Sequence, residues 1–214
     1  MISQLFLRIE EVEFTTSKSN KGNPSNKRDL SDIYVSFIDI LFAVVLGQSF
    51  VLISSEEAFK PWFVDPSENA FEIATLLLVY GLVITSWIGY HQSTRKYPLK
   101  SPLRFVIDVF LLFLYYMGFV NANNFEIINW MFLSAFLSYT AWDVLRVVEY
   151  HNQKSLTRKL LKRLAISIAF AVMFFITTCS YIYVKNKVEG IEWCFFALIL
   201  FLLVVYRYLK RYKE

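Results

Sequence analysis

The chain has 214 residues and a formal net charge of +4, and 56% of its residues are hydrophobic. The mean hydropathy of +0.43 is high for a water-soluble domain, which would not need so many unbroken apolar runs. The two cysteines, Cys179 and Cys194, are too few for a disulfide framework and match no zinc-ligand spacing. We expect both to act as small packing residues inside apolar segments.

Residues 1–32 are predicted to form a cytoplasmic N-terminal tail. Met1–Glu13 is charged throughout and lacks the apolar core of a signal peptide, so no cleavage is expected. Apolar residues recur at helical spacing up to Thr16, which fits either a short helix on the membrane surface or a partly ordered tail. The polar and basic segment Ser17–Arg28 is a predicted linker.

Six apolar segments follow the tail, and each is close to the ~20 residues that a helix needs to cross a bilayer. Asp29, Ser31 or Asp32 offers an N-cap for the first segment. The sequence therefore predicts an all-α polytopic membrane protein, with six transmembrane helices over residues 33–208 and a basic cytoplasmic tail over residues 209–214. The predicted segments are Ile33–Ile53, Ala70–His91, Leu103–Asn121, Ile127–Val148, Leu160–Val184 and Ile191–Tyr208.

Basic residues gather in alternate connections between these segments. All but three of the 22 Lys and Arg residues lie in the N-terminal tail, the second and fourth connecting regions, or the C-terminal tail. Because loops rich in Lys and Arg stay in the cytoplasm, this distribution predicts that both termini are cytoplasmic. The basic residues flank apolar spans and form no groove-sized patch, so nucleic-acid binding is not expected.

Ionisable residues also occur inside the apolar segments, beginning with Asp39 in the first. A carboxylate at the centre of a membrane helix costs roughly 2.5–3.5 kcal/mol, so we expect the other helices to be arranged around the helix that carries Asp39. At ~1.5 Å rise per residue, three acids lie at a similar depth near the cytoplasmic side. With three further side chains they form a predicted intramembrane polar network of Asp39, His91, Arg104, Asp108, Asp143 and Arg146.

Several arrangements are open for these side chains. An inter-helix clamp, a role in carrying protons or ions, and simple contact with water are all compatible with their depth. Arg104 with Asp108, and Asp143 with Arg146, have the spacing of pairs within one helix. The candidate partners of Asp39 are His91 and the hydroxyl groups of Ser36, Ser86 and Tyr90.

Beyond Asp39, the side chains of Val44, Gln48 and Val51 share one stripe of the first segment, with Gly47 beside them. The stripe is aliphatic with a single amide, and such a face can line a narrow pore whose constriction is apolar. It can equally pack against a neighbouring helix of the same chain, where small residues are favoured.

The sequence contains no motif that is typical of an enzyme active site. No Ser/His/Asp set, phosphate-binding loop or glycine-rich nucleotide turn is present. The two histidines and the scattered acids have no metal-ligand spacing. We therefore expect no enzymatic activity, no cofactor and no metal site.

The segment Phe37–Ala43 (FIDILFA) resembles the opening of the first helix in the transmembrane protein 175 potassium channel family, where the motif is R-x-x-x-F-S-D. Ile33 and Ile38 stand where that motif has Arg and Ser. Trp87 and His91 precede a basic loop, like the Trp and His that end the second helix of that family at a shorter spacing. The resemblance covers the first two helices only.

The resemblance implies a homo-oligomer in the cytoplasmic membrane of a prokaryote, in the manner of the tetrameric prokaryotic members, and conduction of a monovalent cation such as potassium. Counted from Asp39, the positions that it implies for the pore constriction are Val44, Gln48 and Val51. The leading hypothesis is therefore an oligomeric cation channel lined by the first helix. The alternatives are a non-conducting or partner-triggered membrane subunit that a soluble cytosolic protein recruits, and a proton-coupled transporter in which Asp39 titrates.

Overall fold

The computed structural model describes residues 25–54, 69–98 and 101–212, and every regular element within these ranges is an α-helix. The described ranges contain six helices that are long and apolar enough to cross a membrane. The all-α prediction is therefore confirmed. The helices are α2 (Ser25–Ser54), α4 (Ala70–Lys96), α5 (Pro102–Val120), α6 (Phe125–Glu149), α7 (Lys154–Val184) and α8 (Ile191–Tyr212).

Several helices extend beyond their predicted apolar segments. α2 begins at Ser25, so the N-cap predicted between residues 29 and 32 is wrong, and the helix includes the end of the predicted tail. α7 begins at Lys154, and α8 continues to Tyr212. Hydropathy marks only the apolar part of a helix, whereas backbone hydrogen bonding can continue into polar and basic residues at its ends. The surface helix predicted before Thr16 lies outside the described residues.

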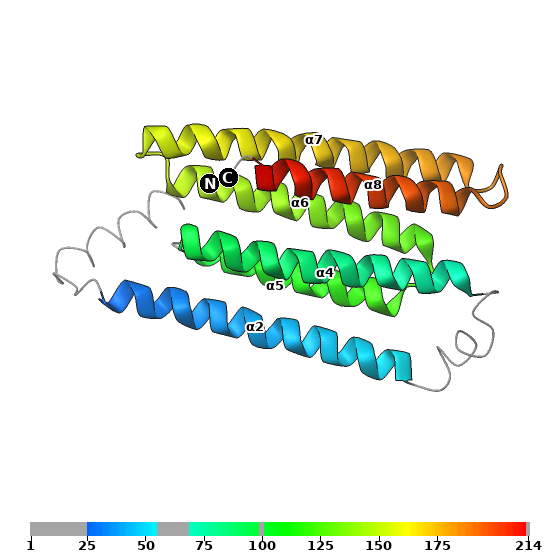
Figure 1. Ribbon diagram of the computed structural model, residues 1–214, viewed down its shortest axis with the longest axis horizontal. Helices are drawn as coiled ribbons and strands as arrows, with labels where there is room; N and C mark the ends of the chain where they lie inside the picture. The colour runs from blue at the N-terminus through cyan, green and yellow to red at the C-terminus, as the bar shows by residue number, and fades with distance from the viewer. Residues whose placement is uncertain (1–24, 55–68, 99–100, 213–214) are drawn as a thin grey trace, which may run out of the picture.

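Consecutive helices run in opposite directions, so α2 begins and α8 ends toward the same end of the bundle (Figure 1). α6 packs against α5 and α7, α8 packs against α7, and α4 contacts both α5 and α8. α2 packs chiefly against α5 at the edge of the bundle (Figure 1). The expectation that the other helices surround the Asp39 helix is therefore wrong for a single chain, because α2 lies at the edge of the bundle (Figure 1). Among the described residues, the partners of the Asp39 carboxylate come from α4.

An aromatic core fills the space between α6, α7 and α8. The Phe136 ring is fully buried and stacks on Phe174, with ring centroids 4.1 Å apart. Tyr206 of α8 meets the same ring edge-on at 4.8 Å, and Phe170 of α7 lies beside it. In lipid, the hydrophobic effect does not drive helices together. Aromatic contacts of this kind therefore stabilise the bundle through dispersion and ring electrostatics.

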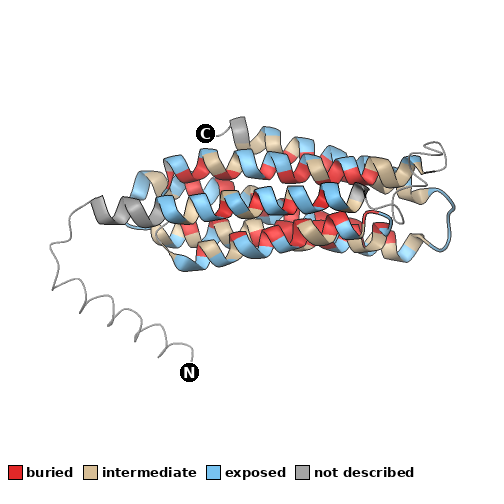
Figure 2. Cartoon of the chain, turned by 90° about the horizontal axis from the view of Figure 1, so that it is seen from below, coloured by how far each residue is buried: buried red, intermediate tan, exposed pale blue. Residues whose placement is uncertain are grey.

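The outside of the bundle is apolar along most of its length. Exposed residues occur on the outer faces along the length of the helices (Figure 2). Large apolar side chains such as Leu137 and Val172 are among them. Because six helices have the length and hydropathy of membrane spans, these faces contact the lipid bilayer, and the protein is an integral membrane protein. Cys179 and Cys194 are free and exposed on the outside, so their predicted role in packing is wrong for the single chain.

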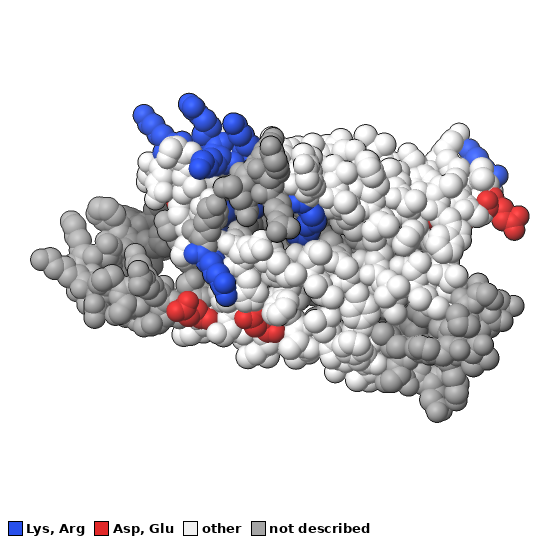
Figure 3. All heavy atoms as spheres, in the orientation of Figure 1, with Lys and Arg blue, Asp and Glu red and all other residues white. Residues whose placement is uncertain are grey.

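Basic side chains gather at the end of the bundle where α2 and α7 begin (Figure 3). We call this the basic end, and the sequence predicts that it faces the cytoplasm. Acidic and basic groups both occur at the opposite end, where Lys185 pairs with Glu126. The basic end carries Arg95, Arg104, Arg158, Lys159, Lys162 and Lys210.

Replacing Phe136 by Ala tests the aromatic core. The substitution removes a fully buried ring with several aromatic neighbours, so we expect a loss of about 3–5 kcal/mol in unfolding free energy. Thermal unfolding of the protein purified in detergent measures the change. Leu137→Ala is the matched control: the neighbouring side chain is 54% exposed, and its loss should matter little. Equal destabilisation by the two variants would contradict this position of the core.

Candidate functional site

Two side chains of α4 hold Asp39 of α2. The indole Nε1 of Trp87 donates to Asp39 Oδ1 at 2.9 Å, and His91 Nε2 lies 2.7 Å from the same oxygen. Trp87 and His91 are four residues apart on one helix, so both reach the same point from adjacent turns. The predicted clamp between Asp39 and His91 is confirmed, and Trp87 is an additional partner. The Asp39 side chain remains 36% exposed, because the clamp lies at the edge of the bundle.

A second contact ties α2 to α4 farther from the basic end. Ser49 Oγ lies 2.6 Å from the hydroxyl oxygen of Tyr80, and Ser49 itself is buried. Between the two levels, Phe42 packs against Trp87 with ring centroids 6.5 Å apart. α2 is therefore fixed in register against α4 by side-chain contacts at both ends of its span.

The predicted pore residues lie on the opposite face of α2, outside the bundle. Val44 and Val51 are 51% and 58% exposed, and Gln48 is exposed between them. The face of α2 that does pack inward includes Ile38 and Phe42, both buried. The structure thus brings the three residues together on one outward stripe. Packing of this stripe within the same chain, which the sequence left open, is wrong.

Arg104 pairs with another helix instead of its own. Its Nη1 lies 2.7 Å from Glu149 Oε2 of α6, and both side chains are almost fully buried. The guanidinium also donates to the carbonyl oxygens of Tyr97 and Pro98, each at 3.4 Å. The intrahelical pair predicted for Arg104 and Asp108 is therefore wrong. The Glu149 carboxylate and the carbonyl groups after α4 draw the guanidinium toward the end of the bundle.

Arg146 is fully buried between aromatic rings. Its guanidinium carbon lies 4.3 Å from the ring centroid of Tyr97 and 4.8 Å from that of Trp142. Arg104 lies 4.4 Å from the same Trp142 ring. Ring faces attract a guanidinium, and stacking leaves the N–H groups at the edge of its plane available to acceptors.

Asp143 joins three helices at this level. The hydroxyl of Ser167 on α7 donates to Asp143 Oδ2 at 2.5 Å, and Lys210 Nζ of α8 donates to the same oxygen at 2.7 Å. Arg146 Nη1 lies 3.5 Å from the other carboxylate oxygen, which confirms the predicted pair within α6. The carboxylate is almost fully buried, so these contacts supply the pairing that a charge needs there.

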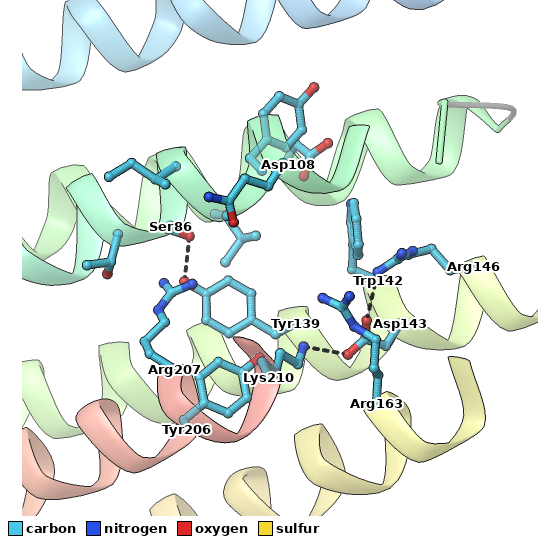
Figure 4. Close-up of a pocket in the computed structure, with 16 residues that line it drawn as sticks. Ser86, Asp108, Tyr139, Trp142, Asp143, Arg146, Arg163, Tyr206, Arg207 and Lys210 are labelled. Carbon is cyan, nitrogen blue, oxygen red and sulfur yellow. Dashed lines mark hydrogen bonds and ion pairs between the residues drawn. The ribbon is translucent and has the colours of Figure 1, made fainter. Parts of the chain in front are cut away.

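A cavity of about 430 Å³ lies beside Asp143, between α4, α5, α6, α7 and α8 (Figure 4). Figure 4 shows cationic side chains that enter it from α7 and α8, and Asp108 on the opposite side. We call this space the basic cavity. Its charged lining residues are Asp108, Asp143, Arg146, Arg163, Arg207 and Lys210.

Three hydroxyl groups meet at one wall of the basic cavity. Ser86 Oγ lies 2.6 Å from the hydroxyl of Tyr115 and 2.7 Å from that of Tyr139, and the two tyrosine hydroxyls are 2.6 Å apart. Each hydroxyl can donate to one neighbour and accept from the other, which satisfies all three inside the bundle. This hydroxyl cluster connects α4, α5 and α6 without a charge.

The predicted polar network is therefore two separate clusters on opposite faces of α4. One contains Asp39, Trp87 and His91, and the other surrounds Asp143 and the basic cavity. Within the described ranges, no three His, Cys, Asp or Glu side chains converge as metal ligands do. The geometry offers cation–carboxylate pairing, anion contacts and bracing between helices.

Sequence reasoning missed several residues of the second cluster. Arg163, Arg207 and Lys210 enter the sequence prediction only as loop and tail charges that set topology, and the predicted network includes neither Ser167 nor Glu149, which follows Arg146 at helical spacing. The signal that could have found them is depth, because Arg163 and Arg207 each lie within a long helix and not in a loop.

No family model, no curated protein and no solved structure matches the chain.

Replacing Glu149 by Gln tests the buried pair. The change leaves the Arg104 guanidinium buried without its counter-charge, so we expect a loss of about 3 kcal/mol or more in unfolding free energy. The double variant Arg104→Met with Glu149→Leu removes both charges and should recover most of that loss. Thermal unfolding in detergent measures both, with Lys159→Gln as the exposed control. A double variant as unstable as Glu149→Gln would argue against a buried ion pair.

Proposed function

We propose that this chain is one subunit of an oligomeric channel for monovalent cations, with α2 lining the pore. The observation that carries the proposal is the position of α2 at the edge of the bundle, where Val44, Gln48 and Val51 face outward on one stripe. A stripe with these side chains suits an apolar constriction with one amide that water can solvate. Association of several copies through α2 would enclose the stripe.

The exposed amide of Gln48 supports the proposal that pore water or a second copy of the chain, and not lipid, covers this stripe. It lies within the membrane-spanning part of α2, where hydrocarbon offers no hydrogen-bond partner to a polar side chain. Water in a pore, or a second copy of the chain, supplies those partners. Lipid alone does not, which favours an oligomer over a monomer in the bilayer.

The clamp on Asp39 supports α2 as a wall that its own subunit braces. Trp87 and His91 hold the helix near the basic end, and the contact between Ser49 and Tyr80 holds it farther along. All these contacts lie on the inward side of α2, so the outward stripe remains available. Asp39 then acts as a positioning residue and not as an ion carrier.

The resemblance of Phe37–Ala43 to the transmembrane protein 175 family supports the details of the proposal. These are a tetramer, potassium as the conducted ion, both termini in the cytoplasm, and the cytoplasmic membrane of a prokaryote as the location. Conduction through such a pore needs neither a cofactor nor an enzymatic step.

Substitution of Val44 by Trp tests the pore. An indole at the constriction in every copy should reduce potassium flux into liposomes of purified protein about tenfold or more. Val172→Trp is the matched control, because Val172 of α7 is 51% exposed, as is Val44. Potassium and sodium are compared in the same preparation, and gel filtration checks the oligomer.

Equal flux through the two variants would contradict a pore along α2. A well-folded oligomer that conducts no ion would instead support the alternative, a subunit recruited or triggered by a soluble partner. The exposed Arg158, Lys159 and Lys162 at the basic end favour that alternative, because they offer a docking surface for an acidic protein.

Substitution of Asp39 by Asn distinguishes a channel from a proton-coupled transporter. The Asn oxygen still accepts from the Trp87 indole, so the channel proposal expects potassium flux within about threefold of the original at each pH tested. A proton-coupled transporter needs a titrating carboxylate and should lose its proton gradient dependence. Flux measured with and without an imposed pH gradient separates the two.

A further inference from the structure

Cations outnumber carboxylates along the basic cavity. Arg146, Arg207 and Lys210 line it, against Asp108 and Asp143. The Asp143 carboxylate is already bound by Lys210 and Ser167, and Arg146 lies beside it. All these residues belong to the membrane-spanning helices, where positive charge without a counter-ion is costly. The cavity therefore favours an anion.

The guanidinium groups of Arg146 and Arg207 carry buried N–H donors that line the basic cavity. Nε and Nη2 of both groups are buried without a hydrogen-bond acceptor among the described residues, whereas Arg146 Nη1 is in an ion pair with Asp143 Oδ1 at 3.5 Å. Arg146 is 0% exposed, and the rings of Tyr97 and Trp142 cover it by stacking. The stacking fixes the plane of the guanidinium without using its N–H groups. Donors held in this way are pre-oriented for oxygen acceptors.

The α4 wall leaves room for the Arg207 side chain. A Cβ added at Gly89 would lie 3.0 Å from Arg207 Nη1, closer than such contacts normally are. Glycine at this position therefore lets the guanidinium lie against the backbone of α4. Figure 4 shows Arg207 extending from α8 toward the α4 side of the cavity, near the hydroxyl cluster.

We propose that the basic cavity binds the phosphate group of an organic ligand. Guanidinium N–H groups match pairs of phosphate oxygens in bidentate geometry, and Lys210 adds a point charge. Water could accept from the same N–H groups, but it does not offset their charge. The volume of about 430 Å³ exceeds a phosphate group alone and lies within the range of small-molecule sites. Trp142 and Tyr206 also line the cavity and can contact the organic part of the ligand.

Two sources can deliver this phosphate. The α4 residues Thr85, Ile88 and Gln92 line the cavity and are exposed, so the cavity opens between helices on that side. Its position near the basic end matches the depth of lipid headgroups if that end faces the cytoplasm. A phosphorylated headgroup can enter from the membrane, and a soluble phosphate monoester can enter from the cytosol. The binding proposal does not depend on ion conduction.

Thermal unfolding of the detergent-purified protein tests the proposal with four probes. The phosphate-bearing probes are dihexanoyl phosphatidic acid and glycerol 3-phosphate, and the controls are dihexanoyl phosphatidylcholine and glycerol. A bound probe at about one hundred times its Kd should raise Tm by about 5 °C or more for a chain of this length. A shift with phosphatidic acid alone identifies a lipid headgroup, whereas a shift with glycerol 3-phosphate identifies a soluble ligand.

Two variants assign the binding to the cavity. Arg207→Gln should raise the probe concentration for a half-maximal shift about tenfold or more, because it removes a charge-assisted contact. Gly89→Ala displaces Arg207 without removing its charge and should weaken binding in the same direction. Lys159→Gln, an exposed change at the same end, should have no effect, and gel filtration confirms that each variant is folded.

The proposal is overturned by any of three results. The first is the absence of a shift with both phosphate-bearing probes. The second is a shift with phosphatidylcholine as large as that with phosphatidic acid, which would indicate a general lipid effect. The third is an unchanged binding curve in the folded Arg207→Gln and Gly89→Ala variants.

Discussion

Charged side chains inside the membrane-spanning helices decide how these helices meet at the basic end. A guanidinium or carboxylate among apolar helices must be paired, stacked or hydrated, and each helix of the basic end contributes to that requirement. Arg104 takes its charge partner from α6, Arg146 takes ring faces from α6 and from the residues after α4, and Asp143 takes donors from α7 and α8. These contacts determine how the ends of α5, α6, α7 and α8 meet, while the aromatic core around Phe136 fixes the spacing farther along.

α4 connects the two polar regions of the molecule. Trp87 and His91 face α2 and hold Asp39, while Ser86, Gly89 and Tyr90 line the basic cavity on another side of the same turns. A change in the position of α4 therefore acts on α2 and on the cavity together. The proposed phosphate site and the proposed pore are therefore linked through the same helix.

Much of this architecture follows from composition. The six spans follow from hydropathy, because a helix that crosses a bilayer needs about 20 apolar residues whatever its neighbours are. Two of the polar pairs follow from spacing and depth: Asp143 with Arg146 is a local pair, and Asp39 with His91 joins two groups at a similar depth in the first two spans. The pair of Arg104 and Glu149 cannot be predicted from spacing or depth. Glu149 lies on another helix, and only the packing of α5 against α6 brings it to Arg104.

The all-α class, the six membrane-spanning helices and the residues that share one stripe of α2 could be predicted from the sequence, since these depend on local composition and helical periodicity. Only the tertiary structure decided that α2 lies at the edge, that the polar residues form two clusters, and that Arg146, Arg207 and Lys210 surround one cavity. The physical reason is that such contacts join residues on different helices. The partner of each residue depends on how its helix is rotated and on which helices lie beside it. Hydropathy treats every apolar face alike, so it predicts neither the rotation nor the neighbours.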